Sequence, residues 1–299
     1  MITVFGSINL DLVVAVPRLP TAGETVTGPD HQSFAGGKGA NQALSACRAG
    51  SDVRMVGAVG KDAFADLALA NMKSEGVDLS GVRSLDGATG LAFIGIDRQG
   101  ENQIIVASGA NARVEADWLS PSLSQGDMLM LQGETPFGEA EKAIAMAGKS
   151  GAKVFWNPAP VPMEDIKALI ETTATLVVNE TEAAEVAERL GIAPEPQQFV
   201  EALAAPERTV VVTLGGDGVV AGKGETRLRL PSPAIKVVDT TGAGDAFCGA
   251  LACALDQGRP FERAIREGVA AGALACTVTG AQSSAPAKDD IARLADQIV

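Results

Sequence analysis

Short apolar runs alternate with longer Ala-rich stretches of helical spacing over most of the chain. The predicted strands are ITVFG (2–6), DVRMVGAVG (52–60), DMLMLQG (127–133), KVFWNPAP (153–160), TLVVNE (175–180) and TVVVTLG (209–215). Helical spacing is seen at 41–49 and 139–148. Strands that are apolar throughout are typical of a parallel sheet covered on both faces. The pattern therefore predicts an α/β fold with a doubly wound, mostly parallel sheet flanked by helices.

Two segments break this alternation. Residues from about 10 to 35 are rich in Pro, Gly and Thr, which favours extended chain over helix. The run TGLAFIGIDRQGENQIIVASG (89–109) reads as a hairpin with its turn at 97–100. Neither segment fits a strand–helix–strand crossover. We therefore expect one domain over 1–299 with a small β-sheet lid formed by about 10–35 and 88–108.

Composition narrows the class of partner. The 299 residues are 46% hydrophobic, enough for a large core, and carry a formal charge of -13. Nucleic-acid binders need a basic surface, so we expect no nucleic-acid partner. No basic leader or long apolar run is visible, so we expect a cytoplasmic protein without a membrane partner. Four cysteines in Ala-rich stretches form no CxxC pair and are expected to be small buried hydrophobes.

The segment VVDTTGAGDAFCGALACAL (237–255) joins a β-rich run to an Ala/Leu helix through a glycine turn. Helix N-termini present unpaired N–H groups to anions, so Gly242, Ala243 and Gly244 are candidates to stabilise a transferring phosphoryl group. Asp245 follows in the first helical turn and is a candidate base for a hydroxyl proton. The alternative is an ordinary helix start in which Asp245 only interacts with the helix dipole. This segment alone leaves both open.

A second glycine turn, FAGGKGANQA (34–43), also opens a helix. Gly37 would let a ligand approach the backbone, and Lys38 and Asn41 would bond its hydroxyl groups; the alternative is a flexible loop with a solvated lysine. In SINLD (7–11), Asn9 and Asp11 lie on one face of an extended segment. Amide and carboxylate groups of this kind bind polyols.

Two further segments have both a functional and a structural interpretation. In VVNETEAAEV (177–186), Asn179 and Glu182 are oxygen ligands suited to a hydrated metal on a triphosphate, or a helix-capping pair. TVVVTLGGDGVV (209–220) would wrap a nucleotide or form a hairpin turn. The sequence GKS (148–150) is no P-loop, because Ala143 replaces the first glycine and a helix precedes it. His31 is the one histidine and lies in the expected lid segment. We therefore expect it to be a surface residue and not the base of a Ser/His/Asp hydrolase.

Taken together, these segments resemble the ribokinase (phosphofructokinase-B type) family of carbohydrate kinases. GGKGAN (36–41) and DTTGAGDAFCGA (239–250) are similar to its two signatures. NPAP (157–160), NETE (179–182), TLGGDG (213–218) and GAQSS (280–284) follow in the family's order. The resemblance runs from about 4 to 286, and several ordered motifs are far more specific than one glycine loop.

The resemblance implies an ATP-dependent kinase that phosphorylates the 5-hydroxyl of D-ribose, using Mg²⁺ and activated by K⁺, and a homodimer formed through the lid. It implies that Asp245 is the base and that Gly242–Gly244 form the anion hole. The implied pentose ligands are Asn9, Asp11, Gly37, Lys38, Asn41, Glu134 and Asp245. The implied nucleotide and magnesium residues are Asn179, Glu182, Thr213, Leu214, Gly215, Gly216, Asp217, Gly218, Gly244 and Val269. The implied monovalent-cation ligands, mostly backbone carbonyls, are Asp239, Thr241, Ala275, Val278, Gly280 and Ser284.

Two positions depart from the family pattern. Val269 stands where some members have a polar residue near adenine, and Cys248 stands in the anion-hole helix at a place that is often Asn.

The alternative substrates are deoxyribose, fructose, a keto-deoxy acid or a nucleoside. A nucleoside would call for an aromatic stacking surface, and only 4% of the residues are aromatic. A sugar-sensing protein without catalysis is the remaining hypothesis, which the retention of Asp245 with the anion-hole glycines disfavours.

Overall fold

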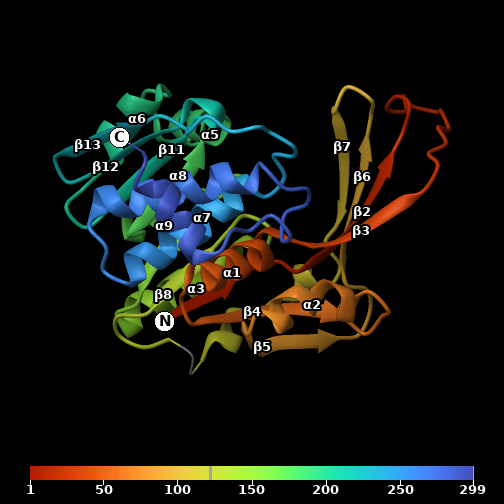
Figure 1. Cartoon of the computed structure of the whole chain (residues 1–299). Coiled ribbons are helices and arrows are strands. Elements are labelled where there is room, and N and C mark those ends of the chain that lie inside the picture. The colour runs from red at the N-terminus through yellow and green to blue at the C-terminus, as the bar shows by residue number, and fades with distance from the viewer. Residues whose placement is uncertain (121–122, 299) are drawn as a thin grey trace.

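The computed structural model describes residues 1–120 and 123–298, and within them a nine-stranded sheet has the order β13-β12-β11-β10-β9-β8-β1-β4-β5 (Figure 1). Its strands are β1 (Ile2–Phe5), β4 (Val53–Gly60), β5 (Asp78–Leu85), β8 (Met128–Leu131), β9 (Lys153–Trp156), β10 (Thr175–Asn179), β11 (Thr209–Thr213), β12 (Val219–Lys223) and β13 (Thr226–Leu230). The strands from β11 to β5 pair in parallel, whereas β12 and β13 are antiparallel. The predicted mostly parallel sheet and its six predicted strands are confirmed.

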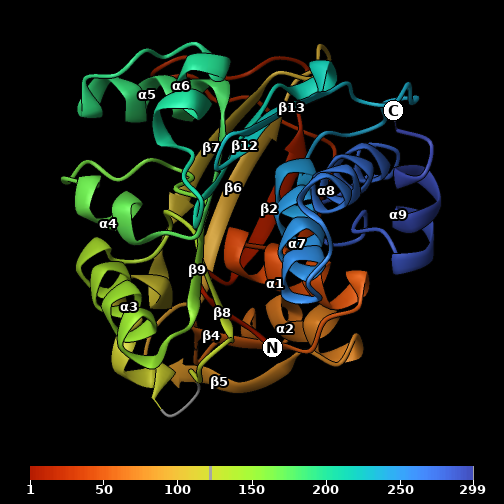
Figure 2. The ribbon, with the colours of Figure 1, turned by 90° about the vertical axis from the view of Figure 1, so that its left-hand side faces the viewer.

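Helices cover both faces of this sheet, as Figure 2 shows with the sheet seen nearly edge-on. The helices α1 (Lys38–Ala49), α2 (Ala65–Ser74), α7 (Ala243–Asp256), α8 (Phe261–Ala275) and α9 (Lys288–Ala295) bury one apolar core. The helices α3 (Phe137–Ser150), α4 (Lys167–Thr172), α5 (Glu180–Leu190) and α6 (Pro196–Leu203) bury a second core against the other face. The 3₁₀ turns η1 (Gly109–Arg113) and η2 (Ala116–Leu119) pack into the second core. Strands β1 and β8 are buried at every residue, as expected between two helical layers.

A separate four-stranded sheet, the lid, projects from the α/β body (Figure 1). Its order is β3-β2-β6-β7, with β2 at Asn9–Ala15, β3 at His31–Gly36, β6 at Gly90–Ile96 and β7 at Asn102–Ala107. Strands β6 and β7 form the predicted antiparallel hairpin, and Gly100 N donates to Asp97 O at 3.1 Å in its turn. His31 is exposed on β3, as predicted for a surface residue.

The segment 209–220 is a hairpin. Strand β11 turns through the short 3₁₀ helix η3 (Gly215–Asp217) into the antiparallel strand β12, and Leu214 N donates to Gly218 O at 2.8 Å. All four cysteines are free thiols: Cys248 and Cys253 are buried, and Cys47 and Cys276 are half-buried. Among the described helices, none has the length and apolar character needed to cross a membrane.

Candidate active site

Helix α7 begins in an open glycine turn at the carboxyl edge of the sheet. Gly242 is its N-cap in the left-handed region, with φ of 76°, and a Cβ there would lie 2.6 Å from the Cα of Ala281. No side chain within residues 1–120 and 123–298 caps this helix start. A Cβ on Gly244 would meet nothing within 4 Å, so there is open space beside the first turn of α7. The N–H of Ala243 donates to the carbonyl of Thr240 at 3.2 Å, so one of the three predicted anion-hole amides is already bonded within the glycine turn.

Asp245 lies in the first turn of α7 and is only 8% exposed. Its Oδ2 accepts a hydrogen bond from Asn41 Nδ2 at 2.9 Å, and its Oδ1 accepts one from Gln42 Nε2 at 3.0 Å. Both donors come from α1, which packs tightly on α7; a Cβ on Gly249 would lie 2.5 Å from Ser45 Cβ. The structure thus brings the predicted base and the predicted sugar ligand Asn41 into direct contact.

The lid supplies Asn9 and Asp11 from strand β2. Asn9 is 4% exposed, and its Oδ1 accepts from Asn111 Nδ2 at 2.7 Å, which leaves the Asn9 NH₂ group for a ligand. Asn111 is itself fixed by accepting from Ile8 N at 2.9 Å. A Cβ on Gly36 would lie 2.2 Å from Asp11 Oδ2, so the first glycine of GGKG makes room for that carboxylate.

Three carboxylates and one ammonium group meet where the lid joins the body. Burial, followed by the negative charges of Glu134 and Asp245, raises the pKa of Asp11 to about 7. The charge of Asp245, with smaller contributions from Glu134 and Glu182, raises the pKa of Lys38 despite its burial. Glu134 Oε2 accepts from the Lys38 backbone N at 3.0 Å. A second acceptor contact of Glu134, from the hydroxyl of Ser7, fixes it beside β1.

Asn179 and Glu182 form the capping box of α5. Glu182 N donates to Asn179 Oδ1 at 2.8 Å, and Asn179 N donates to Glu182 Oε2 at 2.8 Å. The helix-capping interpretation of this pair is therefore correct. The metal-ligand interpretation stays open, because among the described residues the capping box engages only one carboxylate oxygen of Glu182. Burial raises the pKa of Glu182, and Lys38 opposes that shift, so this pair belongs to the same electrostatic site. Among residues 1–120 and 123–298, no three His, Cys, Asp or Glu side chains form a metal cage.

The predicted nucleotide segment lies at the β11–β12 turn. Gly215 and Gly218 have positive φ, and a Cβ on Gly215 or Gly216 would meet nothing within 4 Å, so this turn offers bare backbone. Thr213 is half-buried, Leu214 is buried and Asp217 is exposed. Val269 is 4% exposed and packs in the core on α8.

The residues predicted to hold a monovalent cation lie on the loop before α7 and on the end of α8 with the loop that follows it, and these two segments contact each other. Asp239 Oδ1 accepts from Thr241 N at 2.9 Å, and its Oδ2 accepts from Gly280 N at 2.8 Å. Burial opposes ionisation of Asp239, but these hydrogen bonds outweigh it and hold its pKa below the usual value. The carbonyls of Ala275 and Gly280 accept from the backbone N of Val278 and Ser284, at 3.3 and 3.1 Å respectively.

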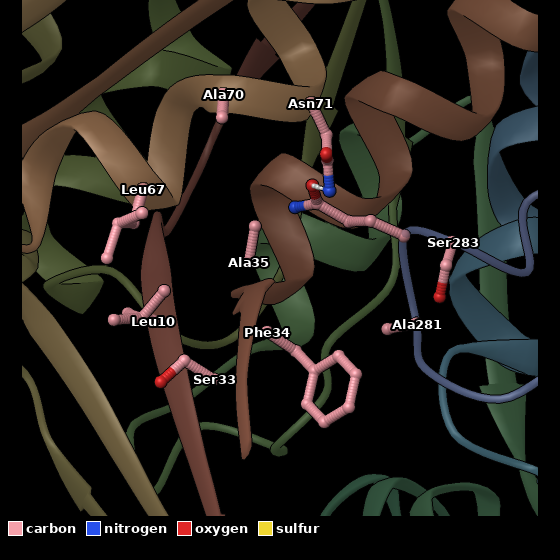
Figure 3. A pocket seen from close by; sticks show the side chains of 10 residues that line it. Leu10, Ser33, Phe34, Ala35, Leu67, Ala70, Asn71, Ala281 and Ser283 are labelled. Atoms are coloured by element: carbon pink, nitrogen blue, oxygen red, sulfur yellow. Dashed lines mark hydrogen bonds between the residues drawn. The ribbon is translucent and has the colours of Figure 1, made fainter.

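Two of the cavities that adjoin the lid also border the α/β body. One of about 460 Å³ is lined by Asn9, Asn111 and Glu134 among others, so it adjoins the predicted sugar ligands. The other, of about 260 Å³, opens between β3, α2 and the loop at 281–283 (Figure 3). Asn71 lines this second cavity and donates to Gln282 Oε1 at 3.1 Å. None of the site residues predicted from the sequence lines this second cavity, and the two cavities share no lining residue.

Sequence reasoning missed four buried amides of the site. Gln42, Gln132 and Asn157 lie behind Asp245, and Asn111 lies behind Asn9. Gln42 lies in the motif GANQA, Asn157 in NPAP and Gln132 at the end of the predicted strand DMLMLQG. An amide side chain with no assigned role inside such a segment was the available sign of a site residue. Cys248 is buried beneath Asp245, and burial raises its thiol pKa, so it is an unreactive packing residue.

Comparison with known proteins agrees with this geometry. Residues 1–288 match the family model described as pfkB family carbohydrate kinase, and the chain belongs to that family. A ribokinase from Haemophilus influenzae is 38% identical over 299 residues, covering 97% of this chain and 96% of the relative. The structure of a Thermotoga maritima ribokinase superposes with a TM-score of 0.88 at 34% identity, over 99% of both chains. A ribokinase from Arabidopsis thaliana complexed with ribose and ATP superposes with a TM-score of 0.86 at 32% identity, over 98% of both chains.

The protein is thus a carbohydrate kinase with the ribokinase fold, and its four-stranded sheet is the lid of that fold.

Proposed function

We propose that this protein transfers the γ-phosphoryl group of ATP to the 5-hydroxyl of D-ribose. The observation that carries the proposal is the position of Asp245, whose carboxylate lies at the uncapped start of α7 and bonds Asn41. One group therefore adjoins both the anion hole and the sugar ligands. The Arabidopsis relative that binds ribose and ATP shares this fold along nearly its whole length.

The sugar would lie between the lid and the carboxyl edge of the large sheet. Asn9 would donate through its free NH₂ group. Asn41 Oδ1, buried without a hydrogen-bond partner among the described residues, would accept a sugar hydroxyl. Asp11, once ionised, would accept another hydroxyl, and Glu134 would accept a further one. This set is rich in acceptors, as a polyhydroxyl substrate requires.

Asp245 would take the proton of the 5-hydroxyl as its oxygen attacks the γ-phosphorus and the bond to the ADP oxygen breaks. The backbone amides of Gly242, Ala243 and Gly244 would stabilise the charge on the transferring group. ATP would approach over the glycine turn at 215–218, with Val269 supplying apolar packing on the adenine side. Asn179 and the free oxygen of Glu182 would hold a hydrated Mg²⁺ beside the phosphates of ATP, where the ion would supply neutralising charge. Such an ion is held mainly by phosphates and water, so a site without a protein cage fits it.

We also propose that K⁺ binds between the 239–241 and 275–284 loops, behind the anion hole. Asp239 already ties these loops together, through Thr241 and Gly280. A cation on their carbonyls would fix the position of Gly242, which packs on Ala281.

The lid further supports a homodimer. Its strands expose two large apolar side chains on one face, Phe93 of β6 and Ile105 of β7, which lie opposite each other and are 45% and 67% exposed. Burying such a patch against a second lid would remove it from water. Light scattering on the intact protein should give a dimer, and Ile105→Lys should give a monomer. A wild-type monomer at all concentrations would contradict the dimer.

The test of the activity is a coupled ADP-release assay across D-ribose, deoxyribose, fructose, a keto-deoxy acid and a nucleoside. D-ribose should give the highest kcat/KM. A higher value for another sugar would replace the substrate but keep the kinase. Ribose binding by calorimetry with no ADP release would instead indicate the sugar-sensing protein.

A further inference from the structure

Gln42 is a fully buried side chain in α1 that has no part in the roles described so far. Its Nε2 donates to Asp245 Oδ1 and to Asn157 Oδ1, each at 3.0 Å. Its Oε1 accepts from Gln132 Nε2 at 2.8 Å. The amide is therefore bonded at both ends, and one of its partners is the proposed catalytic base.

The partners of Gln42 are anchored to the large sheet. Gln132 directly follows β8 and is 2% exposed, and Asn157 directly follows β9. Asn157 Nδ2 donates to the carbonyl of Val177 in β10 at 2.9 Å. A chain of amides thus connects the carboxyl ends of three adjacent strands with the carboxylate of Asp245.

This chain fixes which end of the Gln42 amide faces the base. Turning the amide over would place Oε1 against the carboxylate of Asp245 and against Asn157 Oδ1, whose own amide is fixed by the bond from its Nδ2 to the carbonyl of Val177. Both contacts would be repulsive, because acceptor would meet acceptor. The arrangement therefore always presents an N–H to Asp245 Oδ1.

Such a fixed donor matters because the terminal torsion of an aspartate is broad and selects no single carboxylate plane. A base must lie within hydrogen-bond reach of its proton and be held there. Asn41 holds Oδ2 but belongs to the sugar side, so its own position depends on the ligand. Gln42 holds Oδ1 from the protein interior.

We propose that Gln42 is a positioning residue that orients the Asp245 carboxylate for proton transfer, with Asn157 fixing its amide. The inference rests on the proposed kinase activity. Gln42 touches no substrate in this arrangement, so its loss should lower kcat and leave substrate affinity nearly unchanged.

The test is steady-state kinetics of Gln42→Met, which keeps the side chain's length and removes its hydrogen bonds. We expect kcat to fall by about 10- to 100-fold, the scale of a small misplacement of a reacting group, with KM for ribose and ATP within about twofold of wild type. On an Asp245→Asn background the same substitution should lower the residual kcat by less than about twofold, because the base that it orients is gone. A residue that only stabilises the fold would act alike on both backgrounds.

Gln132→Met is the matched control, because it removes a buried amide of the same chain that does not contact Asp245. Its loss of kcat should be clearly smaller than that of Gln42→Met at a similar loss of thermal stability. Should Gln42→Met fail to fold, Gln42→Asn keeps a buried amide but withdraws it from Asp245 by one methylene, and the same kcat loss is expected. A wild-type kcat in the folded Gln42 variant, or equal losses for Gln42 and Gln132, would overturn the inference. An inactive wild-type protein would instead refute the kinase proposal.

Discussion

Replacing Asp245 by asparagine tests the proposed base with little change of shape. The variant keeps the size of the side chain but accepts no proton at the pH of the assay. Loss of a general base lowers a rate by about 10²–10⁴-fold. At about 1.36 kcal/mol for each tenfold change, this raises the barrier by about 2.7–5.5 kcal/mol. We expect kcat for ribose to fall by that factor.

The structure also predicts what this substitution costs in stability. Both carboxylate oxygens accept a hydrogen bond from an NH₂ group, whereas the new amide has only one oxygen. Gln42 cannot turn over, because its Nε2 also donates to Asn157 Oδ1, and the Asn157 amide is fixed by its bond to the carbonyl of Val177. Asn41 can turn over, because its Oδ1 is buried without a partner among the described residues. The new amide should therefore present oxygen to Gln42 and NH₂ to a turned Asn41, and the loss in free energy of unfolding should stay below about 1 kcal/mol.

Asp245→Ala is the matched comparison, because it removes the same charge and the same base. It leaves the NH₂ groups of Asn41 and Gln42 without an acceptor, and each buried unsatisfied donor costs about 1–3 kcal/mol. The two variants should thus be equally slow in the ADP-release assay but differ in urea denaturation, with the alanine variant the less stable. Near-normal turnover of Asp245→Asn would refute the role of the base. Equal stability of the two variants would refute the hydrogen-bond argument.

Three further predictions concern other parts of the site. The first concerns Asp11→Asn. The pKa of Asp11 is about 7 in the folded state against an ordinary 3.8. Between these pH values the folded state retains a proton that the unfolded state has released, so the wild-type protein loses stability as pH rises. The melting temperature of the variant relative to wild type should therefore increase from about pH 5 to about pH 8, and a constant difference would contradict the pKa. The second concerns Gly244→Ala, which should stabilise α7 by up to about 1 kcal/mol in thermal unfolding. Its methyl group would occupy the open space before the anion hole and should lower kcat/KM for ATP by about tenfold or more. Full activity would place the phosphates elsewhere. K⁺ should activate wild type more than Na⁺, and Asp239→Ala should abolish this preference; equal rates in both salts would exclude the proposed ion site.

Much of the fold follows from local sequence. The six apolar strands, the helix expected over 41–49 and the lid hairpin were predictable because apolar runs, helical spacing and glycine turns act over a few residues. Strand β5 was missed because its sequence, DLSGVRSL, is half polar and lies at the sheet edge. Strand β13 was missed for the same reason, since TRLRL is largely exposed.

The sequence by itself thus determined the fold class, the glycine turns that open α1 and α7, and the position of Asp245 in a first helical turn. Only the tertiary structure decided what surrounds that carboxylate. Gln42 and Asp245 lie 203 positions apart, and Gln132 lies 90 positions from Gln42. Such contacts depend on strand order and on how closely α1 packs on α7, which no local pattern encodes. The raised pKa of Asp11 has the same origin, because burial and the charges of Glu134 and Asp245 exist at that place only after the lid meets the body.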